Sequence, residues 1–166
     1  MQRRTLLKAG LVGGGALLIA SGALRLLGGD SDAAATGNAA RHVLGAVTPA
    51  LLAGALPTDA PARTQALAAS QERTLAAIAA LPPSMRRELG QLFTLLDSPA
   101  GLWLAGLDDW QRADPQVVGS ALQSWRVHRF ALLQTAYHAL HDLVLGPWYA
   151  DPSTWEAIGY PGPIAL

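Results

Sequence analysis

Along residues 41–145 the apolar positions recur three and four residues apart, which is the spacing of α-helices that bury one face. The proline pair at residues 82–83, single prolines and short polar stretches divide this pattern into separate segments. No stretch shows the alternating β-branched residues of a half-buried strand, and no repeat of fixed period is present. The pattern therefore predicts an all-α fold: a single small domain of four to five helices.

The first three expected helices have recognisable boundaries. The first starts near Asn38 and is kinked or broken at Pro49. Thr58 or Asp59 is expected to cap the second, and the third is expected over residues 84–96. The inward-facing residues predicted for these helices are Val43, Leu44, Val47, Leu51, Leu52, Leu67, Ser70, Thr74, Leu75, Ile78, Leu81, Met85, Leu89, Leu92, Phe93 and Leu96.

The longest expected helix follows an irregular stretch at residues 99–114. Asp114-Pro115 is a typical helix start, because aspartate caps the first turn and proline fits the first helical position. The apolar spacing then continues to residue 145, and Arg129 is its one interruption. The residues predicted to face inward are Trp125, Leu132, Leu133, Ala136 and Leu140.

Composition supports helices and excludes several kinds of chemistry. Hydrophobic residues make up 51% of the chain, and most of them are alanine and leucine. The chain has no cysteine, which excludes disulfides, thiolate metal sites, iron–sulfur clusters and covalently attached c-type haem. The 12 basic and 12 acidic residues balance, so no nucleic-acid partner is expected.

The N-terminus is typical of a twin-arginine export signal. Its expected signal residues are Arg3, Arg4, Leu6, Leu7 and Lys8. The uncharged run at residues 9–24 is shorter than the ~20 apolar residues of a membrane-spanning helix. Cleavage is expected after Ala35, with Ala23 as the other site, and an uncleaved membrane anchor is the alternative. The expected division is a signal segment and start of a linker at 1–35, a linker at 36–40, a helical domain at 41–145 and a tail at 146–166.

Candidate catalytic groups are few. His138, His141 and Asp142 have the spacing to share one side of a helix, but a catalytic metal site needs about three ligands with ordered partners around them. We expect these three to be solvated or at the core edge, and Asp108-Asp109 to cap a turn. The sequence contains no phosphate-binding or dinucleotide-binding motif. No catalytic residue, metal or cofactor is therefore assigned to this chain.

The tail at residues 146–163 holds four of the 11 prolines together with four aromatic residues. Ser153 with Glu156, or Asp151 with Pro152, is expected to start one helical turn that carries Trp155 inward. Residues 160–163 are then expected to leave as an extended or turn segment, and prolines on a stiff extended arm would offer Tyr160 to a partner. Whether the tail aromatics form a core layer or an interface stays open, and the candidate partner contacts are Trp148, Tyr149, Trp155, Tyr160 and Pro161.

The tail also carries a resemblance to a known family. The segment WEAIGYPGP at residues 155–163, preceded by WYADP at 148–152, resembles the C-terminal signature of the gluconate 2-dehydrogenase subunit 3 family. The resemblance implies an accessory subunit of a periplasmic dehydrogenase. It implies a partner large subunit of the glucose–methanol–choline type that holds FAD, and often a c-type cytochrome subunit.

Together, the signal and the resemblance predict a non-catalytic subunit that escorts and stabilises a flavin-dependent sugar, polyol or alcohol dehydrogenase. One twin-arginine signal would take both chains through the twin-arginine translocase, because a flavoprotein loaded with FAD must cross the membrane already folded. The expected location is the periplasm, free or held at the inner membrane. The alternative is an independent helical binding protein, periplasmic or membrane-anchored, or a small hydrolase.

Overall fold

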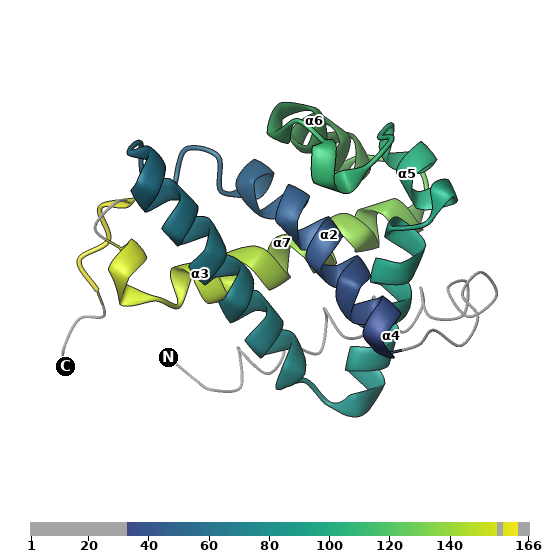
Figure 1. The fold of residues 1–166 in the computed structure, drawn as a ribbon, viewed down its shortest axis with the longest axis horizontal. Helices are drawn as coiled ribbons and strands as arrows, with labels where there is room; N and C mark the ends of the chain where they lie inside the picture. Colours follow the sequence, from purple (N-terminus) through teal and green to yellow (C-terminus); the bar gives the residue numbers. More distant parts are fainter. Residues whose placement is uncertain (1–32, 156–157, 163–166) are drawn as a thin grey trace.

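The computed structural model of the chain describes residues 33–155 and 158–162, and in this part the protein is built from helices without strands (Figure 1). The all-α prediction is therefore confirmed for the described residues. The α-helices are α2 (Ala33–Leu51), α3 (Ala60–Ala79), α4 (Pro83–Leu96), α5 (Pro99–Ala105), α6 (Pro115–Arg126) and α7 (Ala131–Tyr149). Two short 3-10 helices are η1 (Trp110–Arg112) and η2 (Pro152–Thr154).

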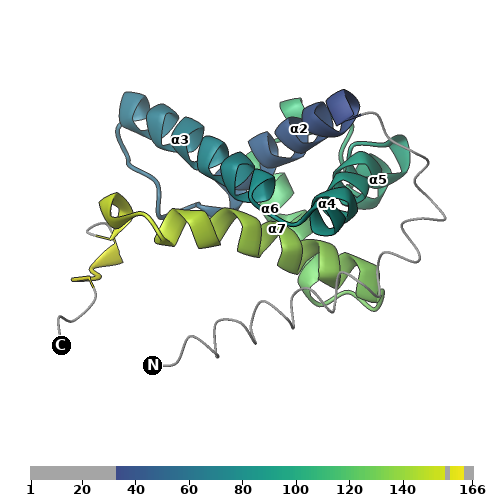
Figure 2. The same ribbon diagram turned by 90° about the horizontal axis from the view of Figure 1, so that it is seen from below.

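Helices α2 and α7 organise the fold. Helix α2 packs against α3, α4, α6, α7 and η1, and α7 packs against α3 and α6 as well. Figure 2 shows α7 running along the length of the molecule beneath α3 and α4. As a result, the two ends of α7 mark the two ends of the molecule, with the C-terminal tail at one end and α5 toward the other (Figures 1 and 2).

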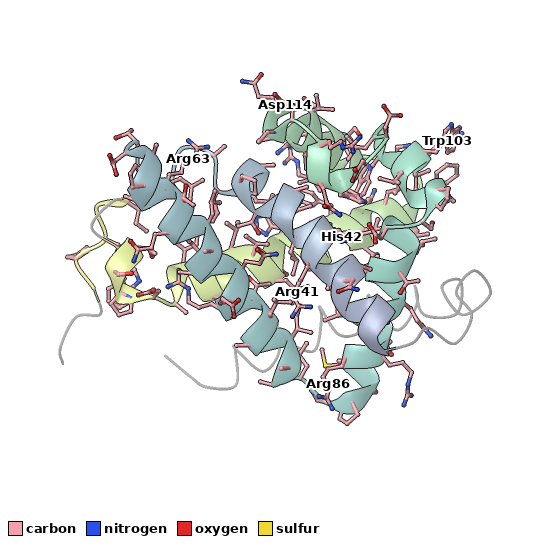
Figure 3. All side chains as sticks on the ribbon, viewed as in Figure 1. Arg41, His42, Arg63, Arg86, Trp103 and Asp114 are labelled. Atoms are coloured by element: carbon pink, nitrogen blue, oxygen red, sulfur yellow. The ribbon has the colours of Figure 1, made fainter. Side chains whose placement is uncertain are left out.

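The core lies between α2, α4, α6 and α7. Its fully buried side chains include Val43, Leu44, Leu52, Phe93, Trp125 and Leu140. Helix α4 passes close to the start of α2, because a Cβ atom on Gly90 would lie only 2.7 Å from Cγ2 of Thr36. Further along this contact, Nδ1 of His42, which is labelled in Figure 3, lies 3.1 Å from Oδ2 of Asp97.

The predicted helix starts after the first helix agree with the structure. Asp59 accepts a hydrogen bond from the backbone N–H of Ala62 at 3.0 Å and so caps α3. Asp114, labelled in Figure 3, accepts one from Gln116 at 2.7 Å and caps α6. These starts were predictable because each aspartate satisfies a backbone N–H that the first turn of its own helix leaves without a partner.

The expected linker at residues 36–40 and the helix start near Asn38 are wrong. Helix α2 already begins at Ala33, and Ala39 and Ala40 belong to the buried core. Alanine has the highest helix propensity, so the alanines in this stretch favour helix from Ala33 on. Pro49 lies inside α2, whose last residue is Leu51.

The expected long helix over 115–145 is also wrong, because it is two helices, α6 and α7, joined by residues 127–130. The break contains neither glycine nor proline. Instead, the backbone N–H of Phe130 donates to Nδ1 of His128 at 3.1 Å, and Gln134 donates to the His128 carbonyl at 2.7 Å. These side chains satisfy backbone groups at the helix ends, and Arg129, the interruption seen in the sequence, falls in the break.

The stretch expected to be irregular contains α5, so the described residues hold more α-helices than predicted. Ser98 caps α5 and Gly106 ends it with φ of +68°, a conformation that glycine adopts without strain. Most predicted inward positions are buried, while seven are only half-buried: Leu51, Leu67, Leu75, Ile78, Leu81, Met85 and Leu132.

The helical domain does not end at residue 145, because α7 continues through Gly146 and Pro147 to Tyr149. Proline in the last turn removes only one backbone hydrogen bond.

Among the described residues, no helix has the length and apolar character required to cross a membrane. The predicted signal residues and cleavage sites lie outside the described residues, apart from Ala35 at the start of α2.

Candidate interaction surface at the C-terminal tail

The tail is joined to α3 by an ion pair between Arg73 and Asp151. The guanidinium carbon of Arg73 also lies 5.8 Å from the centre of the Trp148 ring. The second carboxylate oxygen of Asp151 accepts the backbone N–H of Ser153 at 2.9 Å and so starts η2. Asp151 therefore begins the tail turn and holds it against the body, which agrees with the Asp151-Pro152 alternative.

The buried residue of this turn is Thr154 rather than Trp155. Its hydroxyl lies 2.9 Å from the carbonyl oxygen of Trp148 and 2.8 Å from that of Asp151. Trp148 lies in the last turn of α7 and Asp151 precedes η2, so the hydroxyl joins the tail turn to the end of α7. Trp155 is half-buried and lies outside the core cluster, so the expectation that it faces inward is wrong.

Trp155 instead supports the chain that follows it. Its indole N–H donates to the carbonyl oxygen of Tyr149 at 2.8 Å, which fixes the ring against the end of α7. The Tyr160 ring meets the Trp155 ring edge-on, with 5.2 Å between centroids. A Cβ atom on Gly162 would lie 3.3 Å from the same indole, so the chain folds back over the ring. Of the two expected forms, the extended arm is therefore wrong, since the chain turns back here.

The outer side of this arrangement is apolar and exposed. Tyr149, Ile158 and Tyr160 are 41%, 45% and 46% exposed. We call these three residues, with half-buried Trp155 and exposed Pro161, the tail surface. Trp148 is only 3% exposed and belongs to the core, so this one of the five candidate contacts is not on the surface of the chain.

Sequence reasoning missed Arg73 and Ile158. Arg73 is 78 residues from Asp151, and no local pattern links the two. Ile158 follows Trp155 by three residues in a proline-rich tail, a spacing that could have suggested a shared side.

The other candidate groups make local contacts. Nδ1 of His141 lies 3.0 Å from Oδ1 of Asp142, while the His138 ring packs against Tyr137. No group of three or more potential metal ligands occurs within residues 33–155 and 158–162. Asp109 accepts the backbone N–H of Gln111 at 2.9 Å and caps η1, as predicted for the Asp108-Asp109 pair.

Comparison of the chain with protein-family models, with curated proteins and with solved structures finds no match. The resemblance of residues 148–163 to the gluconate 2-dehydrogenase subunit 3 family therefore stays a prediction.

Proposed function

We propose that this chain is a non-catalytic subunit that binds, stabilises and co-exports a flavin-dependent sugar, polyol or alcohol dehydrogenase. The observation that carries the proposal is the tail surface, an exposed aromatic cluster within the segment that resembles the family signature. In the proposed complex, FAD and the catalytic groups belong to the large subunit. A c-type cytochrome is the proposed third component.

The geometry of the tail surface suits a protein interface. Tyrosine and tryptophan are enriched at interface centres, where they bury much area with few rotatable bonds. The Trp155 ring is already fixed by its bond to Tyr149, and Tyr160 already packs on that ring. Less conformational entropy is then lost on binding than for free side chains.

The location proposed for the complex is the periplasm, free or at the inner membrane. The twin-arginine pattern at Arg3 and Arg4 supports this proposal, because that pathway exports folded proteins together with their cofactors.

The interface is tested by measuring how tightly the large subunit is retained by wild type and by Tyr160→Ala. We expect about 30-fold weaker binding, corresponding to the ~2 kcal/mol of an interface anchor. Trp103→Ala is the matched control, since Trp103 is 80% exposed on α5, away from the tail (Figure 3). Equal loss in both variants, or no loss in Tyr160→Ala, would contradict the proposal.

The escort role is tested by replacing Arg3 and Arg4 with lysine. Dye-reducing activity of the partner should then remain in the cytoplasm together with this chain. Full dehydrogenase activity in the periplasm would contradict the escort role, but it would not contradict the contact between the two subunits. A chain that is exported and purified without any flavoprotein would instead support an independent binding protein or hydrolase.

A further inference from the structure

A second apolar surface lies at the other end of α7, where residues 127–130 join α6 to α7. We call these residues, together with Arg126 at the end of α6, the connector. Val127 is 73% exposed and Phe130 is 53% exposed. The buried neighbours Trp125 and Leu133, at 1% and 4% exposed, hold the connector on both sides. Two apolar side chains are thus directed outward from a well-packed part of the molecule.

The backbone of the connector is fixed by its own hydrogen bonds. The N–H of His128 donates to the Trp125 carbonyl at 3.2 Å, and the N–H of Phe130 donates to the His128 ring at 3.1 Å. Gln134 donates to the His128 carbonyl at 2.7 Å. The exposure of Val127 and Phe130 is therefore part of the folded structure.

The connector is also basic. Arg126 and Arg129 are exposed, and neither forms an ion pair with another described residue. The Arg129 guanidinium carbon lies 4.8 Å from the centre of the Phe130 ring. Two positive charges thus lie beside the two exposed apolar side chains. A binding partner of complementary charge would therefore be anionic.

The connector and the tail surface are separated by the length of α7 (Figure 2). Both surfaces are therefore free to be occupied at once.

We propose that the connector contacts a bilayer containing anionic phospholipid, with Val127 and Phe130 at the apolar boundary and the two arginines at the headgroups. Each arginine near such a surface contributes about 1 kcal/mol, and a small apolar contact alone gives only marginal binding. The charge and the small size of the apolar contact favour lipid over a protein groove, which would need a larger apolar area. The proposal does not depend on the dehydrogenase partner.

A local probe on the full chain tests the contact, because the N-terminal run could itself hold the chain on vesicles. The chain contains no cysteine, so Val127→Cys provides a single site for an environment-sensitive fluorophore. Ala150→Cys is the matched control, exposed at the opposite end of α7. Emission is recorded with vesicles of phosphatidylcholine containing phosphatidylglycerol, and with phosphatidylcholine alone.

With the anionic vesicles, we expect a blue shift for the label at position 127 and none for the label at position 150. Adding Arg126→Gln and Arg129→Gln should weaken the apparent affinity for the anionic vesicles, measured from this shift, about 30-fold. As a control, the circular dichroism spectrum of each variant should match that of wild type, which shows that the fold is retained. A shift of equal size with neutral vesicles, no shift while the chain co-floats with anionic vesicles, or a shift produced only by the purified flavoprotein would each overturn the proposal.

Discussion

The two ends of α7 both expose aromatic side chains, but they hold them in different ways. At the C-terminal end, Asp151 is bound to Arg73 of α3, a contact that spans 78 residues of sequence. At the N-terminal end, the connector is held by hydrogen bonds within residues 125–134. The tail surface therefore depends on the packing of the whole domain, whereas the connector depends on the ends of its two helices.

This difference predicts how strongly variants at each end change the free energy of unfolding. The largest effect is expected for Trp148→Ala, because Trp148 is buried beneath the tail and lies beside Arg73. Loss of a buried tryptophan typically destabilises a protein by about 3–5 kcal/mol. The melting temperature should fall by roughly 6–20 °C. Tyr149→Ala, the exposed neighbour, is the control, and equal melting of the two variants would contradict the core position of Trp148.

Asp151→Ala should have the next largest effect. It removes both the ion pair to Arg73 and the cap of η2, and the paired side chains are 32% and 23% exposed. Partial exposure weakens the pair, so we expect about 2 kcal/mol in total. Asp109→Ala is closely matched, since Asp109 also caps a 3-10 helix and lies 3.6 Å from an arginine, Arg112, which is 89% exposed.

The two aspartate variants are compared by denaturant unfolding and by limited proteolysis. Asp109→Ala should lose about 1 kcal/mol or less, and its tail should remain as resistant as in wild type. Early cleavage after residue 150 should occur only in Asp151→Ala. If both variants lost equal stability and kept the tail protected, the contact with α3 would contribute nothing beyond an ordinary cap.

At the connector, Gln134→Ala should have a smaller effect. It removes one hydrogen bond to the His128 carbonyl, which typically contributes about 1 kcal/mol. Gln123→Ala, at an exposed position on α6, is the control. Hydrogen exchange should show faster opening of the first turn of α7 in Gln134→Ala alone. If Gln134→Ala lowered the free energy of unfolding as much as Asp151→Ala does, the connector would be coupled to the whole domain.

The smallest effect is expected for Phe130→Ala, since the ring is largely exposed and contacts the guanidinium of Arg129. Surface changes of this kind usually stay within about 0.5 kcal/mol. Thermal melting should therefore match that of wild type. A clear loss of stability would show that Phe130 packs on the body and is not a free contact surface.

The parts of the fold that follow from neighbouring residues were predictable. Asp59 and Asp114 cap helices through their own side chains, so their sequence positions were sufficient. The break between α6 and α7 was missed because it uses no glycine or proline, and Arg129 on the apolar face was its only signal. In the tail, Asp151 and Pro152 indicated a turn, but nothing local indicated that Tyr160 and Gly162 would fold back onto Trp155.

The sequence alone determined the helical class, the order of most helices and most of the core faces, because spacing and capping act within a few residues. Only the tertiary structure decided that Trp148 is core, that Thr154 is the buried residue of the tail turn, and that Arg73 holds Asp151. Each of these outcomes depends on which distant helix occupies the space beside the residue. Burial and ion pairing are settled by packing between elements, and a local pattern carries no information about that neighbour.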